Sequence, residues 1–468
     1  MFLWAASGLA LLVYLVIRKF FTCPPELSHL PRVPLRSLLL SFLSGETEDE
    51  RTQRLIVPFQ NERGHGVVVV WALGEWYVHV LNHKLGKELM ENKHIHKQMP
   101  RTEMAFWKLT GMHNVVLTEG DVWKKQSRIV RNALHRNIPI DQFTALSHQL
   151  FHLMGDGGHI RWDDFTHRFT LDAVGTAVMG YDFQALLKPN GSFVQHYHEV
   201  MREISHPLYV AFPVLERCFP RFRLHRKIEA FKARFQQIVD LKRQDPGNDF
   251  VSYLLDQQDL SGKEVRDNIV TMFMAGHDTT AGALSTIVYY LAKYPQHQKR
   301  ARAEVVCVLG DTSDPTVGDF ENMPFLNACI RESLRLNGPS TITIPRISLV
   351  PTRLGPYTIP PNVPMALNLF AILHDGTTWP NPDQFDPERF MGTAQTDGEW
   401  LPFGTGSRRC PASNFSLYEQ RTLTALLLRR FEWTLPAHSV HRDGIRNAFS
   451  TFALNLPKDM YIDFKLVR

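Results

Sequence analysis

The most regular run of apolar positions lies near the middle of the chain, over residues 261–295. Ser261 and Glu264 have the spacing of a capping box that starts a helix, and Pro295 cannot continue one. Between these ends the side chains are apolar on nearly every face, which indicates a helix buried at the centre of a large body. A helix of about thirty residues would be ~45 Å long, the width of a whole domain.

Weaker patterns predict further elements on either side of this helix. An apolar helix is expected over about 325–336, where an Asn-Gly-Pro sequence stops it, and another over about 411–430. Residues 64–82 combine β-branched and aromatic runs around a Gly-Glu pair, which predicts a β-hairpin. Short strands are expected over 339–364, and a small sheet in the final forty residues. The pattern therefore predicts a mainly α fold with small β-sheets, of the α+β class.

The N-terminal segment has the pattern of a membrane anchor. Residues 2–17 are apolar apart from Ser7, and two cations and two phenylalanines follow them. These sixteen residues fall short of the ~20 that span a bilayer, but the long cationic side chains can reach the membrane surface and let the phenylalanines complete the span. We predict a single transmembrane helix at 1–21, with a stiff proline-rich spacer at 22–36 and the following chain in the cytoplasm.

The composition is that of a globular protein, with 44% apolar and 21% charged side chains among 468 residues. This length would suggest about three domains. No linker, low-complexity block or repeat divides residues 37–468, however, so we expect one large domain there. Lys and Arg outnumber Asp and Glu by 52 to 47, a small positive balance that favours an acidic partner or a membrane surface.

The cysteines do not form a disulfide or zinc pattern, because their number is odd, their spacing is wide and no Cys-x-x-Cys pair occurs. They are Cys23, Cys218, Cys307, Cys329 and Cys410. The last stands in a sequence built around it. Gly404 and Gly406 permit a tight loop, and Pro411 favours the start of a helix at the sulfur. The helix N-terminus and the two preceding arginines favour a thiolate, so Cys410 is a candidate axial ligand of iron.

The loop has the pattern F-G-x-G-x-R-x-C, formed by Phe403, Gly404, Gly406, Arg408 and Cys410. It resembles the heme-binding signature of the cytochrome P-450 monooxygenases, in particular membrane-anchored eukaryotic members of fungal type. Four more stretches agree in order and spacing, so the resemblance covers nearly the whole chain. It implies the cytochrome P-450 fold, heme b held by the Cys410 thiolate, and insertion of one atom of dioxygen into a substrate.

The sequence Ala-Gly-His-Asp-Thr-Thr lies at the middle of the predicted central helix. Ala275 and Gly276 are small enough for a flat cofactor and dioxygen to approach the backbone there. Thr279 can bond the carbonyl of residue 275, which would loosen the helix and open a groove. The resemblance implies that Asp278 and Thr279 are the acid and alcohol that deliver protons to the activated dioxygen.

Two further motifs are structural by this resemblance. Glu332 and Arg335 lie one turn apart on an apolar helix, and Arg389 follows in a Pro-Glu-Arg-Phe sequence. The resemblance implies that these three side chains form a buried salt-bridged triad. Two other Glu-x-x-Arg sequences are interpreted as surface pairs: Glu48 with Arg51, and Glu199 with Arg202.

The heme propionates require cationic partners, and here the chain departs from the family pattern. The family usually has an arginine four residues after Trp123, where this chain has Ser127. The candidates for this region of the cofactor are Trp123, Arg128 or Lys124, Arg346 and Arg408.

The segments that match the substrate-recognition regions of the family are apolar and carry no obvious charged anchor. They are 103–116, 206–213, the stretch before 275, 340–344 and 450–452. We therefore expect a bulky lipophilic substrate, such as a terpenoid, steroid or polyketide, in either secondary metabolism or detoxification. The stretch after Cys410 is too short for a flavin domain, so a separate NADPH-cytochrome reductase would supply electrons. Lys124, Lys125, Arg128 and Arg131 are its candidate docking face.

Membrane lipid is a further expected partner, with the chain in the endoplasmic reticulum membrane and its domain on the cytoplasmic side. Residues 221–235 mix cations with aromatic side chains, which we interpret as an amphipathic helix near the membrane and not as a nucleic-acid interface. Two other functions share the expected cofactor: a heme-thiolate isomerase or dehydratase, and a non-catalytic heme sensor. The Asp278–Thr279 pair argues against both.

Overall fold

The computed structural model describes residues 18, 21–61, 64–136, 138–392, 398–450 and 454–467. The predicted anchor at 1–21 therefore lies outside the described residues, apart from Arg18 and Phe21. Within the described ranges, no helix combines the length and the apolar character that a membrane crossing requires.

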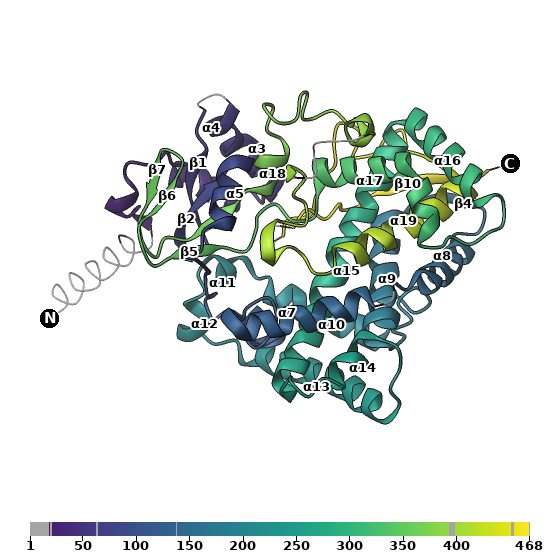
Figure 1. Ribbon diagram of the computed structural model, residues 1–468, viewed down its shortest axis with the longest axis horizontal. Helices are drawn as coiled ribbons and strands as arrows, with labels where there is room; N and C mark the ends of the chain where they lie inside the picture. Colours follow the sequence, from purple (N-terminus) through teal and green to yellow (C-terminus); the bar gives the residue numbers. More distant parts are fainter. Residues whose placement is uncertain are drawn as a thin grey trace, which may run out of the picture.

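Helices form most of the molecule and surround the long central helix α15, which runs through the middle of Figure 1. The described helices are η1 (Pro25–Leu27), α2 (Leu35–Leu43), α3 (Glu48–Leu55), α4 (Val57–Asn61), α5 (His83–Glu91), α6 (Ala105–Thr110), α7 (Gly120–His135), α8 (Ile140–Met154), α9 (Trp162–Ala173), η2 (Val174–Met179), α10 (Ser192–Ile204), α11 (Pro207–Ala211), α12 (Leu215–Cys218), α13 (Phe222–Gln244), α14 (Phe250–Leu255), α15 (Gly262–Lys293), α16 (Pro295–Leu309), η3 (Gly318–Asn322), α17 (Pro324–Asn337), α18 (Leu369–Leu373), η4 (Pro387–Phe390), η6 (Gly406–Arg408) and α19 (Ser413–Arg430).

The central helix begins as its sequence predicts. The Ser261 hydroxyl accepts a hydrogen bond from the Glu264 backbone N–H, and the Glu264 side chain accepts one from the Ser261 N–H, which completes the capping box. The helix ends at Lys293, two residues before Pro295. Nearly all of its side chains are buried because α9, η2, α17 and α19 pack around it. The predicted helix over 325–336 is confirmed as α17.

The strands form small sheets at two ends of the molecule, with β1, β2 and β5 near the N-terminal end and β4 and β10 near the C-terminus in Figure 1. They are β1 (Val67–Ala72), β2 (Glu75–Val80), β3 (Ile95–Lys97), β4 (Gly157–Arg161), β5 (Arg346–Ser348), β6 (Thr352–Leu354), β7 (Tyr357–Ile359), β8 (Met365–Leu367), β9 (Phe431–Thr434) and β10 (Tyr461–Leu466). The sheet orders are β1-β2-β8-β5-β3, β4-β10-β9 and β6-β7.

The predicted hairpin is confirmed as β1 and β2. Trp71 pairs with Trp76 across it, and the two turn residues, Leu73 and Gly74, have φ values of 50° and 79°. A positive φ is unfavourable for leucine and is adopted readily by glycine, so the strain of this turn lies at Leu73 and not at Gly74. The buried side of this sheet packs into its own hydrophobic cluster, while a larger cluster surrounds α15.

The predicted buried triad is confirmed. Arg335 Nε lies 2.7 Å from Glu332 Oε2, and Arg389 Nε lies 3.3 Å from Glu332 Oε1. The side chains of Glu332 and Arg335 are fully buried. The Arg335 guanidinium also donates to the Leu373 carbonyl at 2.8 Å, so the triad fixes α17 against the end of α18.

One of the two expected surface pairs is wrong. Arg51 is only 3% exposed, because its guanidinium donates to Ser41 Oγ at 2.8 Å and to the Glu46 carbonyl at 2.9 Å as well as to Glu48. The other pair, Glu199 with Arg202, lies on the exposed face of α10 as expected.

Candidate active site

The Cys410 loop has the conformation that its glycines predict. Gly404 and Gly406 have φ values of 70° and 71°, a region that side chains other than glycine rarely adopt. The Cys410 backbone N–H donates to the Phe403 carbonyl at 2.9 Å, and the Gly404 N–H donates to the Leu401 carbonyl at 2.9 Å. These bonds close the loop and hold Cys410 just before α19.

The electrostatics at Cys410 differ from the expectation. Burial raises the pKa of its thiol, while the Ala412 backbone N–H and Arg409 act in the opposite direction. Helix α19 begins at Ser413, two residues later than predicted, and Arg408 points to another part of the site. Within the protein, burial therefore outweighs the groups that favour the thiolate. A bound metal cation would favour the thiolate, because a coordinating thiol loses its proton.

The central helix is open where the sequence predicts a groove. Ala275 is exposed although the helix around it is buried, and the Thr279 hydroxyl donates to the Ala275 carbonyl at 2.8 Å. The next residue fixes the two helices of the site together, since Thr280 Oγ1 lies 3.1 Å from Ser416 Oγ on α19. The Cys410 helix is thus bonded to α15 beside the open turn.

Gly276 is small for a reason that the sequence did not indicate. A Cβ atom at this position would lie 2.9 Å from Cγ2 of Val174, so the glycine allows α15 to pack closely against η2. Its expected contact with a cofactor stays a prediction.

Both carboxylate oxygens of Asp278 contact side chains of α9, α10 or α15 itself. Tyr197 of α10 donates to Oδ2 at 3.0 Å, and Oδ1 lies 3.1 Å from His277 Nε2 and 3.4 Å from His167 Nδ1. Burial alone would raise the pKa of the Asp278 carboxyl, but the two histidines lower it well below its ordinary value. The carboxylate is therefore ionised and fixed. The sequence did not indicate these partners, because they come from α9 and α10.

Three cations gather on the other side of the Cys410 loop. Lys97 and Arg346 are direct partners in the β3–β5 ladder, and Arg408 lies near both. Burial and the two arginines lower the pKa of Lys97 to about 7, and burial and Arg346 lower the pKa of Arg408 to about 10. Glu119 is the carboxylate that opposes them. Like charges facing each other across a ladder are destabilising, and one carboxylate against three cations leaves this cluster with an excess of positive charge.

The predicted propionate residues divide between this cluster and the surface. Arg408 stacks on Trp123 with its guanidinium carbon 4.0 Å from the ring centroid, and it donates to the Thr118 carbonyl at 2.8 Å. Arg346 is half-buried, and its buried Nε has no hydrogen-bond partner among the described residues. Arg128 is 68% exposed and lies 3.9 Å from Asp259, and Lys124 is also exposed, so neither belongs to the cluster. Lys97 was missed because only strand pairing brings it beside Arg346.

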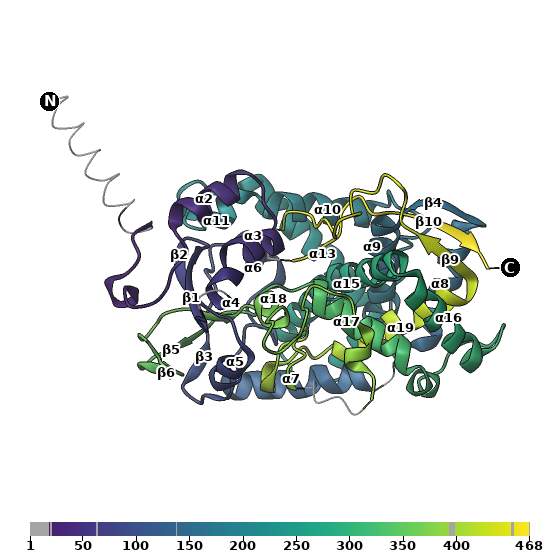
Figure 2. The same ribbon diagram turned by 90° about the horizontal axis from the view of Figure 1, so that it is seen from above.

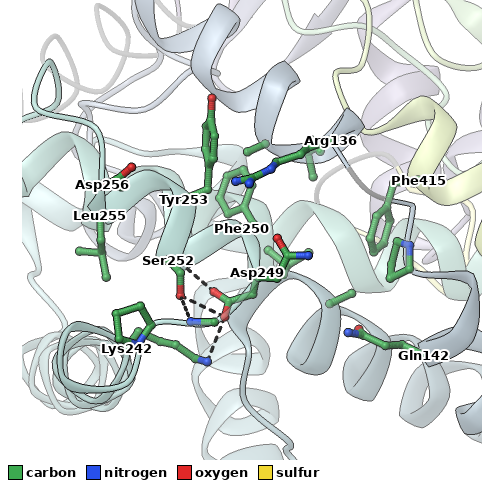
Figure 3. Close-up of a pocket in the computed structure, with 18 of the residues that line it drawn as sticks. Arg136, Gln142, Lys242, Asp249, Phe250, Ser252, Tyr253, Leu255, Asp256 and Phe415 are labelled. Carbon is green, nitrogen blue, oxygen red and sulfur yellow. Dashed lines mark hydrogen bonds and ion pairs between the residues drawn. The ribbon is translucent and has the colours of Figure 1, made fainter.

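A separate pocket of about 390 Å³ lies between α7, α13, α14 and η2. Figure 3 shows Lys242 directed toward Asp249, and their charged atoms are 2.9 Å apart. Asp249 also accepts a hydrogen bond from the Ser252 N–H at 2.8 Å, which caps α14. Of the described residues that line this pocket, none is a predicted site residue, so we assign its polar contacts to the local structure.

The residues around Cys410 fit heme. The Cys410 thiol could bind a metal as the thiolate, an open turn of small residues lies on α15, and the excess positive charge of Lys97, Arg346 and Arg408 suits an anion such as a propionate. These features come from separate segments of the chain, and heme would match all of them.

Comparisons with known proteins agree with this site. A family model described as Cytochrome P450 matches residues 31–461. Cytochrome P450 4A7 of Oryctolagus cuniculus is 28% identical over 354 residues, which cover 68% of this chain and 69% of that protein. The cytochrome P450 monooxygenase xanG of Aspergillus fumigatus is 24% identical over 93% of this chain and 88% of that protein. This second relative is consistent with the fungal type of the sequence.

A solved structure shows the same fold. The crystal structure of the cytochrome P450DA heme domain superimposes with a TM-score of 0.82 over 94% of this chain and 97% of that chain, at 21% identity. The fold is thus the mainly helical P450 fold with small sheets. The cofactor of the family is heme b with an axial cysteine thiolate, and the chain belongs to the cytochrome P450 family of monooxygenases.

Proposed function

We propose that the chain inserts one oxygen atom into a lipophilic small molecule, with Cys410 as the axial ligand of heme b. The observation that carries this proposal is that the Cys410 helix is bonded to α15 next to the open turn, through Thr280 and Ser416. Bound heme supplies the activation of dioxygen. The protein positions the substrate, excludes water and delivers protons.

We assign Thr279 and Asp278 to proton delivery. The Thr279 hydroxyl lies on the open turn and donates to the Ala275 carbonyl, so its oxygen remains free to accept a proton as it passes one on. Asp278 is the acid beside it. Phe403, Gly404, Ala275 and Gly276 are the further proposed contacts of the cofactor.

Thr279→Ala is expected to separate reductant use from product. NADPH consumption should continue while product per NADPH falls by roughly tenfold or more, since a positioned proton donor contributes about 100-fold or more to such steps. The measurement is product, peroxide and NADPH in the presence of reductase and dioxygen. Thr286→Ala is the matched control, because Thr286 donates to the Gly282 carbonyl at 2.8 Å in the same way further along α15.

The same measurement distinguishes the two other functions. A heme-thiolate isomerase or dehydratase would form product without NADPH and dioxygen. A heme sensor would form no product in the wild type or in either variant. Equal product per NADPH in wild type and Thr279→Ala would overturn the role of Thr279.

We further propose that Lys97, with Arg346 and Arg408, binds the heme propionates in place of Arg128. The pKa of Lys97 is about 7 without an anion, and a propionate would raise it, so heme binding takes up a proton between about pH 7 and pH 10. Heme affinity should therefore fall as pH rises through this range, by at most about tenfold per pH unit. The measurement is heme loss to a scavenger protein. Lys97→Met should remove this pH dependence, whereas Arg128→Met should keep it; the reverse result would favour Arg128.

For the substrate, the support is the apolar character of the predicted substrate-recognition segments. Met99 and Ile344 are 54% and 43% exposed, which leaves apolar surface beside the β3–β5 ladder. Of the predicted segment 450–452, the structure describes only Ser450. A terpenoid, steroid or polyketide would suit such a lining. A screen for substrates that shift the heme spin state tests this class, and binding restricted to small charged compounds would contradict it.

We propose that the chain is anchored in the endoplasmic reticulum membrane through 1–21, with the domain on the cytoplasmic surface. Phe21 stacks on Trp71 at 5.2 Å and meets Phe212 at 5.8 Å, which places the start of the described chain near α11. Figure 2 shows α2 and α11 together at this end. Exposed apolar side chains occur on α2, α11 and the start of α13: Leu40, Leu43, Leu208, Phe219 and Phe222. Flotation with phospholipid vesicles tests this contact.

The proposed electron donor is a separate NADPH-cytochrome reductase. The predicted docking cations are engaged within the chain: Lys124 with Asp121, Lys125 with Glu264, Arg128 with Asp259, and Arg131 with the Ser407 carbonyl. An acidic partner would compete with these contacts. Arg131 contacts the Cys410 loop directly, which supports docking at this face. Electron transfer that does not slow with added salt would contradict it.

A further inference from the structure

We propose that the pocket between α7, α13, α14 and η2 binds a flat aromatic carboxylate, held by Arg136 and the ring of Tyr253. Cys410 and the open turn of α15 do not line this pocket. None of the described residues that line it belongs to the contacts proposed above for heme, substrate, reductase or membrane. The inference goes beyond the proposed function and does not depend on it.

The charged side chains on the α13 side of the pocket are already paired. Lys242 lies 2.9 Å from Asp249 Oδ2, and Asp249 also accepts hydrogen bonds from the backbone N–H and the hydroxyl of Ser252, at 2.8 and 3.1 Å. Arg243 lies 3.0 Å from Asp240. The local structure therefore neutralises both cations that α13 contributes to the lining.

Arg136, just after α7, is a cation of the lining that the fold leaves without a counter-charge. It is exposed, and its guanidinium forms no ion pair or hydrogen bond with another described residue. The guanidinium carbon lies 5.9 Å from the centroid of the Tyr253 ring, and Figure 3 shows the two groups beside each other in the pocket. The remaining carboxylate of the lining, Asp256, lies on the opposite side of the Tyr253 ring in that view. The guanidinium is thus free to bind an anion.

The charges of the lining favour a carboxylate over a phosphate group. A guanidinium presents parallel N–H groups that match the two oxygens of a carboxylate. Arg136 supplies one positive charge that is not neutralised, which matches one negative charge. A phosphate group carries more negative charge at neutral pH, and the carboxylates of Asp249 and Asp256 would repel the excess.

The apolar part of the lining favours an aromatic body for the ligand. Leu134, Val178 and Phe415 contribute apolar surface to the pocket and are themselves buried. The Tyr253 ring is half-buried, so part of its surface is open to an aromatic ring of the ligand. The volume of about 390 Å³ is at the lower end of the range for small-molecule sites, about 300–1,000 Å³. The pocket therefore suits a compound with one or two fused rings.

A ligand in this pocket would contact the helix that follows Cys410 without contacting the heme site. Phe415 lies on α19 and packs edge-to-face against Phe143 of α8, with ring centroids 5.1 Å apart. The bound ligand would join α7, α14 and α19, so it should raise the melting temperature of the protein. It should leave the spin state of the heme unchanged, because neither Cys410 nor the open turn lines the pocket.

Equilibrium dialysis of 2-naphthoate against the heme-loaded full chain tests the site, with protein-free detergent as the blank. One equivalent of 2-naphthoate should bind, with a Kd on the order of 0.1–1 mM for a ligand of this size. The neutral analogue 2-naphthamide should bind about tenfold or more weakly, because it lacks the charge that pairs with Arg136.

Two arginines of the pocket provide a matched pair of variants. Arg136→Gln should weaken the binding of 2-naphthoate by about tenfold or more and leave the binding of 2-naphthamide unchanged. Arg243→Gln is the control, because Arg243 is also exposed and lines the same pocket but is paired with Asp240. This variant should keep the wild-type affinity for 2-naphthoate.

Variants of Tyr253 test the aromatic part of the proposal. Tyr253→Leu should weaken 2-naphthoate binding by roughly threefold to tenfold, and Tyr253→Phe should keep the wild-type affinity, because the ring and not the hydroxyl makes the contact. Equal loss in the two variants would contradict the role of the ring.

Three results would overturn the site. The first is equal affinity for 2-naphthoate in wild type and Arg136→Gln. The second is a change of heme spin state that saturates together with the bound 2-naphthoate, since the probe would then lie at the heme. The third is no binding to wild type at about ten times the expected Kd. The affinity and its dependence on Arg136 do not involve turnover, so failure of the proposed function would leave this test valid.

Discussion

Replacing Cys410 by alanine is expected to abolish the red-shifted Soret band of the reduced carbonyl complex and all NADPH-dependent product formation. A thiolate at Cys410 would donate electron density to the iron of bound heme, and such donation favours O–O bond cleavage. The hydrogen bond from the Cys410 N–H to the Phe403 carbonyl closes the loop that carries this sulfur. The measurement is the absorption spectrum of the reduced protein under carbon monoxide.

The control for this experiment is Cys329, which is buried, whereas Cys410 is half-buried. Cys329 lies on α17 with no exposed surface, and burial raises the pKa of its thiol. Cys329→Ala should keep the red-shifted band, with a loss of packing as its main effect. A variant Cys410→His tests the donor itself, because an imidazole would hold heme without the band that thiolate donation produces. Retention of the band in Cys410→Ala would show that another residue is the ligand.

The environment of Cys410 also explains why the Cys410→Ala substitution should abolish the red-shifted band completely. Burial raises the pKa of the thiol, so the folded chain without metal favours the neutral form. A coordinated metal would change this by placing a cation at the sulfur. Arg409 also favours the thiolate, but burial outweighs it.

The parts of the structure that depend on local rules could be predicted from the sequence. The capping box of α15 and the positive φ of Gly404 and Gly406 involve residues a few positions apart. The bond from Thr279 to the Ala275 carbonyl follows from helix geometry, because residues four apart lie one above the other. The family could be recognised from the spacing of Phe403, Gly404, Gly406, Arg408 and Cys410 for the same reason, because these residues are close together in the sequence.

The parts that depend on distant pairing could not be predicted. Lys97 joins Arg346 only through the β3–β5 ladder, and His167 meets Asp278 only because α9 packs against α15. Gly276 depends likewise on Val174 of η2. Arg51 shows the opposite error, since a charged pair that looked like surface is covered by α2. The chemical role of a single residue was therefore easier to predict from the sequence than the distant residues that contact it in the fold.

Arg335→Leu is expected to lower the free energy of unfolding by about 3–5 kcal/mol, because it leaves the buried Glu332 carboxylate without its main partner. The two arginine nitrogens nearest to it lie 2.7 and 2.9 Å from the carboxylate oxygens, and both side chains are fully buried. Arg389 at 3.3 Å and the Asp386 N–H at 3.0 Å remain, but neither replaces a bidentate guanidinium. The measurement is urea unfolding of the heme-loaded protein.

The matched control is a pair with the same helical spacing on the surface. Asp240 and Arg243 of α13 are also three residues apart, their charged atoms lie 3.0 Å apart, and both are about half exposed. Arg243→Leu should change stability by about 1 kcal/mol or less, because solvent screens an exposed pair. Equal losses for the two variants would mean that burial of the Glu332–Arg335 pair contributes nothing.

A double variant distinguishes the cost of an unpaired charge from the worth of the pair. Replacing Glu332 and Arg335 together by apolar side chains removes both buried charges, so it should destabilise the protein less than the sum of the two single changes. Arg389 would then become the unpaired cation, but its side chain is 11% exposed and donates to the Asn381 carbonyl at 3.0 Å, so water and that carbonyl solvate it. A double variant as unstable as the sum would mean that the three side chains act independently, which their shared contacts on the Glu332 carboxylate contradict.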